Sequence, residues 1–185
     1  EKLEELSFKI SPKSFFQTNT RQAENLYHVV KDFAALNGNE IVYDLYCGTG
    51  SIGIFLSKKA KKIIGVDVVE DAIKDAKENA ELNDITHASF FYGDVIEICN
   101  DEFFNKHGRP DVVIVDPPRA GLHAKLISKL IEIRSPKIVY VSCNVATQAR
   151  DLQLLSDIYS VERLQPVDMF PHTHHIECVA ELRLK

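Results

Sequence analysis

The sequence predicts an α/β fold in which a mostly parallel sheet is covered by helices on both faces. Short β-rich runs alternate strictly with amphipathic helical stretches through most of the chain, as they do in parallel sheets. A glycine-rich run at residues 48–53 joins an early strand to the helix after it. Beyond residue 157 the pattern changes to two strands with a polar connection, which predicts an antiparallel hairpin at the edge of the sheet.

The elements follow from hydrophobic periodicity and from residues that start helices. The first helix is predicted over residues 22–36, and Asn19 or Thr20 can cap its start. The remaining predicted helices span residues 51–59, 70–82, 95–106, 123–134 and 145–157. Strands are predicted at residues 41–46, 62–67, 88–92, 111–115, 138–142, 160–169 and 177–184, which makes a seven-stranded sheet. We expect residues 1–20 to form a lead-in segment that contributes to the cofactor site and residues 21–185 to form one catalytic domain.

Composition is that of a globular protein without a membrane segment. The chain has 185 residues, of which 45% are hydrophobic and 26% charged. No apolar run reaches the roughly 18–20 residues that span a bilayer, and residues 1–5 lack signal-peptide character. The four cysteines lie far apart without a C-x-x-C pair, which favours a reducing cytosol. We therefore expect a cytoplasmic monomer with no membrane partner.

Gly48 and Gly50 belong to a G-x-G-x-x-G run that follows a strand and opens a helix, a pattern typical of dinucleotide sites. Asp44 disfavours that interpretation, because its carboxylate is unfavourable beside a pyrophosphate and suits the ammonium group of a methionine moiety. Asp67, at the end of the next strand, can accept hydrogen bonds from a ribose diol. The run from Asp44 to Gly50 resembles the first motif of class I methyltransferases. This resemblance implies a Rossmann-like fold and S-adenosyl-L-methionine as the cofactor.

Polar clusters also follow the later strands, at the edge where open α/β sheets bind ligands. Asp94 follows the third strand, residues 116–121 (D-P-P-R-A-G) the fourth, and residues 142–144 (S-C-N) the fifth. A D-P-P sequence is typical of amino methyltransferases, which need an aromatic residue after it to stack the flipped base. Arg119 occupies that position here, which disfavours methyl transfer to an amine.

Cys143 favours methylation of a pyrimidine carbon instead. Uracil C5 is a poor nucleophile, and a thiolate that adds at C6 converts the ring to an enolate able to attack an electrophilic methyl group. A base must then remove the C5 proton. Cys143 can ionise at a polar strand end, and Glu177, at the start of the last strand, is the candidate base. Arg119 can neutralise the developing enolate. Three other cysteines are expected to be inert: Cys47, Cys99 and Cys178.

Three histidines, His172, His174 and His175, lie in the connection of the predicted hairpin. No second cluster of Cys, His or Asp with ligand spacing accompanies them. We therefore expect no metal site and place this loop near the mouth of the substrate site.

Five segments occur in the order found in RNA 5-methyluridine methyltransferases: residues 16–19 (F-Q-T-N), 44–50, 116–121, 142–144 and 175–177 (H-I-E). The chain resembles that family over nearly its whole length. The resemblance implies that Cys143 is the nucleophile and Glu177 the base. It further implies cofactor binding by a set of six residues: Gln17, Tyr46, Ser51, Asp67, Asp94 and Asp116.

The resemblance also implies an RNA substrate, for which we expect 23S ribosomal RNA ahead of tRNA. Family members carry N-terminal RNA-binding portions, and the absence of an initiator Met suggests that this chain is a fragment of a longer one. A net charge of −5 agrees with that view, because basic side chains dominate affinity for nucleic acids. Specificity for one uridine is expected to reside in those other portions and in RNA shape.

Three alternatives stay open. Cytosine-C5 methylation also uses a thiolate at C6, but its RNA enzymes usually carry Pro-Cys in the fourth motif, where this chain has Pro117 and Pro118. Methylation of an amine is disfavoured by Arg119. A non-catalytic cofactor-binding module that scaffolds RNA would have no need of both Cys143 and Glu177.

Overall fold

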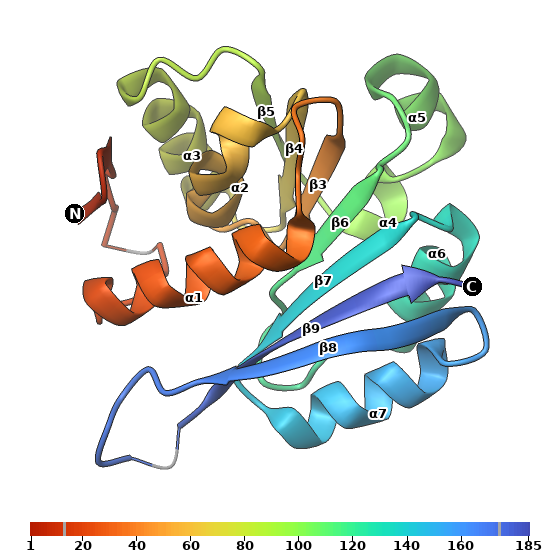
Figure 1. Cartoon of the computed structure of the whole chain (residues 1–185). Coiled ribbons are helices and arrows are strands. Elements are labelled where there is room, and N and C mark those ends of the chain that lie inside the picture. The colour runs from red at the N-terminus through yellow and green to blue at the C-terminus, as the bar shows by residue number, and fades with distance from the viewer. Residues whose placement is uncertain (13, 174) are drawn as a thin grey trace.

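The computed structural model describes residues 1–12, 14–173 and 175–185. Its main sheet has seven strands in the order β5-β4-β3-β6-β7-β9-β8 (Figure 1). The five strands from β5 to β7 in this order run parallel to their neighbours. Strand β9 is antiparallel to both β7 and β8. The strands are β3 (Ile41–Leu45), β4 (Lys62–Asp67), β5 (Ala88–Tyr92), β6 (Val112–Val115), β7 (Lys137–Ser142), β8 (Tyr159–Val167) and β9 (Glu177–Leu184). The predicted mostly parallel seven-stranded sheet with a C-terminal hairpin is confirmed.

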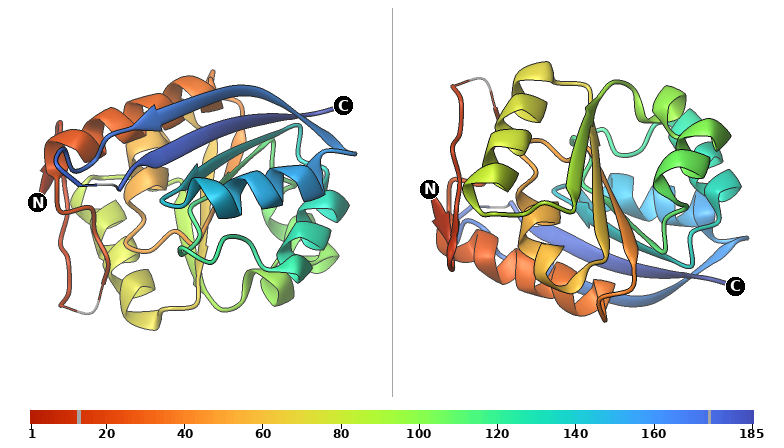
Figure 2. Two further views of the ribbon diagram at one scale, coloured as in Figure 1. Left: turned by 90° about the horizontal axis from the view of Figure 1, so that it is seen from below. Right: turned by 90° about the horizontal axis from the view of Figure 1, so that it is seen from above.

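Helices cover both faces of this sheet (Figure 2). Alternate strand residues face opposite sides and divide the apolar side chains between two cores. One core lies under α1–α3 and includes Val139, Val141 and Val179; the other lies under α4–α7 and includes Tyr140 and Leu182. The helices are α1 (Thr20–Ala34), α2 (Ser51–Leu56) with a 3₁₀ turn at Ser57–Lys59, α3 (Glu70–Leu82), α4 (Val95–Ile98), α5 (Asp101–His107), α6 (Ala124–Ile133) and α7 (Val145–Leu155).

Two local predictions differ from the structure. The single helix expected over residues 95–106 is wrong, because Asn100 interrupts it. The Asn100 side chain accepts a hydrogen bond from the amide of Phe103 at 3.0 Å and so starts α5 as a separate helix. The sequence also gave no sign of the two-stranded sheet formed by β1 (Lys2–Leu3) and β2 (Leu6–Ser7).

The strand order creates a crevice at one edge of the sheet. The chain passes from β3 outward to β4 and β5, then returns to the other side of β3 as β6. The loops after β3 and β6 therefore diverge at the carboxyl ends of the strands, where α/β sheets bind ligands. Among the described residues, no helix has the length and apolar character needed to cross a membrane.

Candidate active site

The loop after β3 is shaped by left-handed backbone at Tyr46, Gly48 and Gly50, with φ of 62°, 52° and 76°. The amide of Gly50 closes the turn onto the carbonyl of Cys47 at 2.8 Å. A Cβ on Gly50 would lie 2.8 Å from the Phe90 ring, so both conformation and packing require glycine there. The glycine run is thus a tight strand-to-helix turn with little room for side chains on its packed side.

Asp44 lies at the base of this loop and is 1% exposed. Its Oδ2 accepts a hydrogen bond from the amide of Gly53 at 2.9 Å, whereas its Oδ1 has no partner. Burial, together with the nearby charge of Asp67, raises the pKa of Asp44 to about 7. Within the described residues, the only other buried side-chain oxygen or nitrogen without a partner is Thr49 Oγ1. An unpaired buried carboxylate oxygen suits a cationic hydrogen-bond donor on a ligand.

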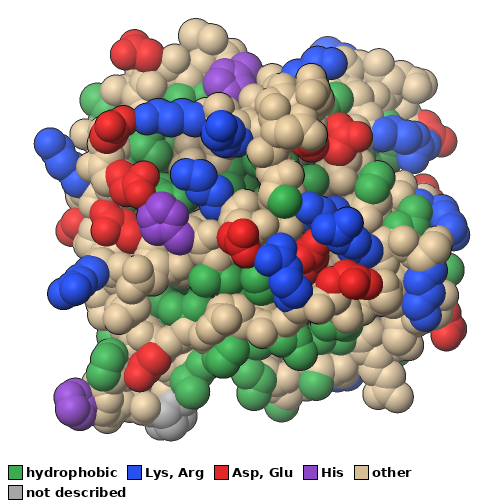
Figure 3. Space-filling view, in the orientation of Figure 1, with side chains coloured by type: hydrophobic (Ala, Val, Ile, Leu, Met, Phe, Trp, Pro, Cys, Tyr) green, Lys and Arg blue, Asp and Glu red, His purple; other side chains and the backbone are tan. Residues whose placement is uncertain are grey.

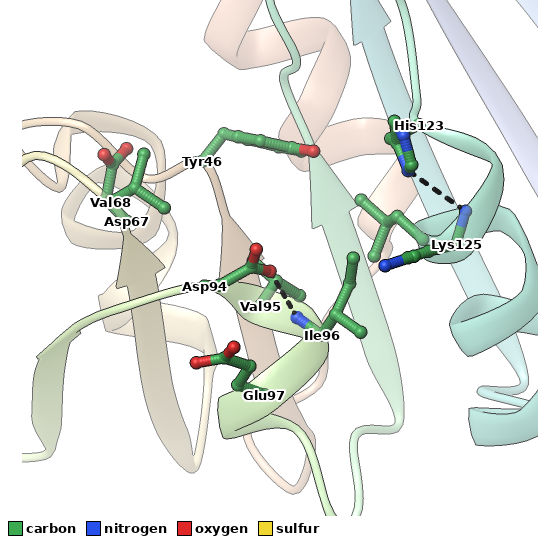
Figure 4. Close-up of a pocket in the computed structure, with 10 residues that line it drawn as sticks. Tyr46, Asp67, Val68, Asp94, Val95, Ile96, Glu97, His123 and Lys125 are labelled. Carbon is green, nitrogen blue, oxygen red and sulfur yellow. Dashed lines mark hydrogen bonds between the residues drawn. The ribbon is translucent and has the colours of Figure 1, made fainter.

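A pocket of about 300 Å³ opens beside the glycine loop (Figure 4). Tyr46 and Asp94 reach it from the loops after β3 and β5, and Asp67 from the end of β4. His123 and Lys125 border it at the start of α6. Asp67 accepts hydrogen bonds from the amides of Gly48 and Val69, both at 2.8 Å, so the carboxylate is held in place. Asp94 is fixed by capping α4 through the amide of Ile96 at 2.8 Å. Carboxylate oxygens keep further lone pairs for a ligand's hydroxyl groups.

Cys143 and Glu177 lie opposite each other across two neighbouring strands. In the antiparallel pairing of β7 with β9, Ser142 is the partner of Cys178. Cys143 comes directly after that pair on one strand and Glu177 directly before it on the other, and the charge of Glu177 acts on the Cys143 thiol. Glu177 follows the alternation of Val179, which faces the α1 side of the sheet. The topology thus brings the expected nucleophile and base together.

A cluster of carboxylates surrounds Cys143. Burial raises the pKa of Asp116 well above its usual range, and the charges of Glu177 and Asp44 raise it further. Burial also raises the pKa of Glu177, against the opposing effect of Arg119. The pKa of the Cys143 thiol is raised above its ordinary value near 9 by burial, Glu177 and Asp116, while Arg119 lowers it. Burial and the two carboxylates therefore oppose ionisation of the thiol, and Arg119 favours it.

Side chains of α7 hold the loop that carries Arg119. The carbonyl of Arg119 accepts hydrogen bonds from Asn144 Nδ2 and Thr147 Oγ1, each at 3.2 Å. The buried Asp151 accepts from the amide of Leu122 at 2.7 Å. The Arg119 side chain itself lies 3.2 Å from His175 Nδ1 on the hairpin connection. Sequence reasoning missed these supporting residues, because polar positions on a predicted helix give no sign of what they contact.

Tyr27 is another residue near the site that the sequence did not single out. It is 3% exposed on α1, and its hydroxyl lies 2.8 Å from the Ser51 hydroxyl. Burial raises its pKa, and the charges of Asp116, Asp44 and Glu177 add to that rise. An aromatic residue at helical spacing is typical of a core position, so the sequence gives no sign that Tyr27 lies near the site.

Comparisons with known proteins identify the family of this chain. The model of the family described as tRNA (Uracil-5-)-methyltransferase matches residues 2–185. The chain belongs to this family. An uncharacterized RNA methyltransferase of Bacteroides thetaiotaomicron is 55% identical over the whole chain, which covers 41% of that relative. One from Enterococcus faecalis is 50% identical, with 96% of the chain and 39% of the relative covered. The chain thus spans about two fifths of the length of these relatives.

Solved structures place this tRNA (Uracil-5-)-methyltransferase family member within the expected fold. The Pyrococcus abyssi tRNA (uracil-54, C5)-methyltransferase, solved in complex with S-adenosyl-L-homocysteine, is 41% identical, with a TM-score of 0.85 over 98% of this chain and 43% of that one. A dimethyladenosine transferase of Plasmodium falciparum, 19% identical with a TM-score of 0.68 over 87% of this chain and 62% of that one, shares the fold alone. The resemblance and the fold class predicted from sequence are confirmed.

The remaining candidate residues of this family member divide into buried and exposed groups. Gln17 is 9% exposed and follows Phe16, whose side chain belongs to the core under α1–α3. Burial raises the pKa of the three further thiols, those of Cys47, Cys99 and Cys178. His172 is exposed and His174 lies outside the described residues. No group of three or more potential metal ligands occurs in the part of the chain that the structure describes.

Proposed function

We propose that this chain is the catalytic part of an enzyme that methylates uracil C5 in RNA with S-adenosyl-L-methionine. The observation that carries the proposal is the meeting of Cys143 and Glu177 at the adjoining ends of β7 and β9, with Arg119 and Asp116 acting on the same thiol. Acyl or phosphoryl transfer would not require a thiol and a carboxylate at this spacing next to a cofactor-type glycine loop. Family membership supports the same reaction.

The residues at the crevice fit the cofactor. The unpaired Asp44 Oδ1 suits its ammonium group, and Asp67 and Asp94 suit hydroxyl groups in the 300 Å³ pocket. The net negative charge of the carboxylates suits a sulfonium cation. When bound, S-adenosyl-L-methionine supplies an electrophilic methyl group. The residues that we propose to hold it are Gln17, Tyr46, Gly48, Gly50, Ser51, Asp67, Asp94 and Asp116, together with Asp44.

The chemistry that we assign to the chain begins with the Cys143 sulfur. Its thiolate forms a bond to uracil C6, and the C5=C6 electron pair moves onto the enolate, where Arg119 balances the charge. With the cofactor bound, C5 would take the methyl group as its bond to the sulfonium sulfur breaks, S-adenosyl-L-homocysteine would be the leaving group, and C5 would briefly carry both methyl and hydrogen. Glu177 removes that hydrogen as a proton; the electron pair restores C5=C6 and the sulfur–C6 bond breaks. Cys143 and the ring are regenerated, and Glu177 keeps the proton until solvent takes it.

The substrate is proposed to be a structured RNA whose target base is flipped into the crevice. We keep 23S ribosomal RNA ahead of tRNA as a prediction, while the named activity of the Pyrococcus abyssi relative is on tRNA. Acidic and basic side chains intermingle on the face shown in Figure 3. The net charge of −5 is unfavourable for contact with phosphates, so we assign much of that contact to the portions of the longer relatives that this chain does not match.

The test combines trapping with nucleoside analysis. RNA that contains 5-fluorouridine should form a stable adduct with the wild-type protein. The fluorine at C5 replaces the proton that the base removes, so the sulfur–C6 bond cannot be broken again. Cys143→Ala should abolish both the adduct and turnover, whereas Cys178→Ala, which alters the neighbouring buried thiol, should keep both. Mass spectrometry of ribosomal and transfer RNA from cells without the gene should show loss of 5-methyluridine from one of them. Full activity of Cys143→Ala would contradict the mechanism, and loss of 5-methylcytidine instead would contradict the substrate base.

A further inference from the structure

From Ser7 at the end of β2, the lead-in segment runs along α3, and alternate residues of it bond through their backbone to side chains of the helix and of its C-cap. Asn83 Oδ1 accepts from the amide of Ser7 at 2.8 Å, and Asn83 Nδ2 donates to the Ser7 carbonyl at 2.8 Å. Asn79 makes the same pair of bonds with Lys9, at 2.7 and 3.1 Å. Asp75 accepts from the amide of Ser11 at 2.8 Å. Three side chains on one helix thus bind three alternate residues of the lead-in segment.

The spacing of these contacts matches two regular geometries. Asp75, Asn79 and Asn83 are four residues apart, which is about 6 Å of rise along a helix. Their partners are two residues apart, which is about 6.6 Å along an extended chain. The helix positions increase as the partner positions decrease, so the segment runs antiparallel to α3. We call Asp75, Asn79 and Asn83 the α3 ladder.

Asp75 ends the ladder with the strongest set of contacts. Besides the amide, its carboxylate accepts the hydroxyl groups of Ser11 and Ser14, both at 2.6 Å. These hydrogen bonds lower the pKa of Asp75 although burial alone would raise it. The ladder is therefore closed by a charged, fully paired carboxylate at the end nearer to Phe16 and Gln17.

Asn79 differs from the other two members because it also contacts the glycine loop. Its Nδ2 donates to the carbonyl of Thr49 at 3.2 Å as well as to that of Lys9. Asn79 is 0% exposed, so water cannot replace either bond. Thr49 stands between Gly48 and Gly50. One buried amide therefore joins the lead-in segment, which carries Gln17, to the turn at the base of the candidate cofactor site.

We propose that Asn79 is a positioning residue that couples docking of the lead-in segment to the cofactor-binding conformation of the glycine loop. The proposal rests on the proposed function, since it assigns the ligand of that loop. Coupling of this kind is reciprocal: ligand binding at the loop stabilises the docked segment, and docking strengthens ligand binding. Asn83 holds the same segment, and its side chain bonds to Ser7 and to the Asn79 carbonyl and not to the glycine loop, which makes it the matched control.

The experiment compares Asn79→Ala with Asn83→Ala in the full chain and uses S-adenosyl-L-homocysteine as the probe. Calorimetry should show affinity reduced about tenfold in Asn79→Ala, which corresponds to about 1.4 kcal/mol, and within about twofold of wild type in Asn83→Ala. Equal affinities in the two variants would overturn the coupling. In the wild type, adding the probe should slow amide exchange of a peptide covering residues 7–11, and unchanged exchange would overturn it even where Asn79→Ala fails to fold. Absence of probe binding to the wild type would instead contradict the proposed function.

Discussion

Strand β9 carries two glutamates on the same face, four residues apart, and their surroundings are opposite. Glu181 is 1% exposed and pairs with Arg163, Arg183 and Lys137. These partners outweigh burial and lower its pKa. Burial raises the pKa of Glu177, and Arg119 is the cation that opposes this rise; the neighbouring carboxyl that feels the charge of Glu177 is Asp116.

The same contrast separates Asp75 from Asp44. Asp75 accepts several hydrogen bonds and has a lowered pKa, whereas Asp44 keeps an unpaired oxygen and has a pKa raised to about 7. A buried carboxylate with all its hydrogen bonds made contributes to the fold. One that lacks partners costs stability until a ligand or a proton arrives, which is typical of functional sites. Among these four groups, the number of partners, more than burial, distinguishes Asp75 and Glu181 from Asp44 and Glu177.

The largest effect on turnover should come from removing the negative charge of one of the two β9 glutamates. Glu177→Gln should lower turnover by about 10²–10⁴-fold, because the C5 proton has no base. The bond between Cys143 and C6 should still form, so denaturing gels should show RNA adducts accumulating with unmodified RNA and cofactor. Glu181→Gln should leave turnover per folded molecule close to that of wild type. Unchanged turnover in Glu177→Gln would remove the assigned base.

Stability should respond in the reverse order. Glu181→Gln should lower the free energy of unfolding by about 1–3 kcal/mol, because Arg163 loses a charged partner at a buried position. The measurement is urea denaturation at neutral pH, with Glu162→Gln on the exposed part of β8 as the control. A stability loss as large in Glu177→Gln as in Glu181→Gln would erase the distinction between the two glutamates.

The sequence predicts where these residues lie along the strands, but not which side chains surround them. Periodicity predicted the sheet, and the strand ends predicted where Asp44, Asp67 and Cys143 would gather, because parallel strands share one ligand-binding edge. Periodicity could not predict the α3 ladder. Asn79 and Asn83 are polar residues on an amphipathic helix, and their partners are backbone atoms some 70 residues away, which leave no trace in local composition.

The register of β9 against β7 likewise could not be predicted from the sequence. The pairing of Cys143 with Glu177 depends on how far β9 slides along β7, and a shift of one residue would turn Glu177 to the other face. The family resemblance supplied the two roles before geometry did. The raised pKa of Cys143 also could not be anticipated, because Asp116 and Glu177 come from different strands and only the fold places both beside the thiol.

Asp44→Asn should stabilise the ligand-free protein while weakening cofactor binding. The unfolded carboxyl has a pKa near 3.8 and the folded one about 7. Between those values the native state keeps a proton that the unfolded state releases, so this group's contribution to stability falls as pH rises. Asparagine retains an acceptor for the Gly53 amide and removes that fall. Denaturation at pH 8 should show a gain on the order of 1 kcal/mol over wild type, and at pH 4 little difference. A gain of equal size at both pH values would exclude the charge as its cause.

The smallest effect, a shift of no more than about one pH unit, tests how the crevice controls its thiol. Native Cys143 should react with iodoacetamide at a rate that rises with pH along a titration centred above 9, since burial, Glu177 and Asp116 raise its pKa. Cys47, Cys99 and Cys178 are buried and should stay unlabelled, which isolates the signal. Glu177→Gln should move the midpoint down, because a negative charge is removed, and Arg119→Met should move it up, because the opposing positive charge is lost. Midpoints that move in the same direction in both variants would mean that accessibility, not charge, governs the reactivity of the thiol. Glu177 would then differ from Glu181 only in its partners and not in its effect on the nucleophile.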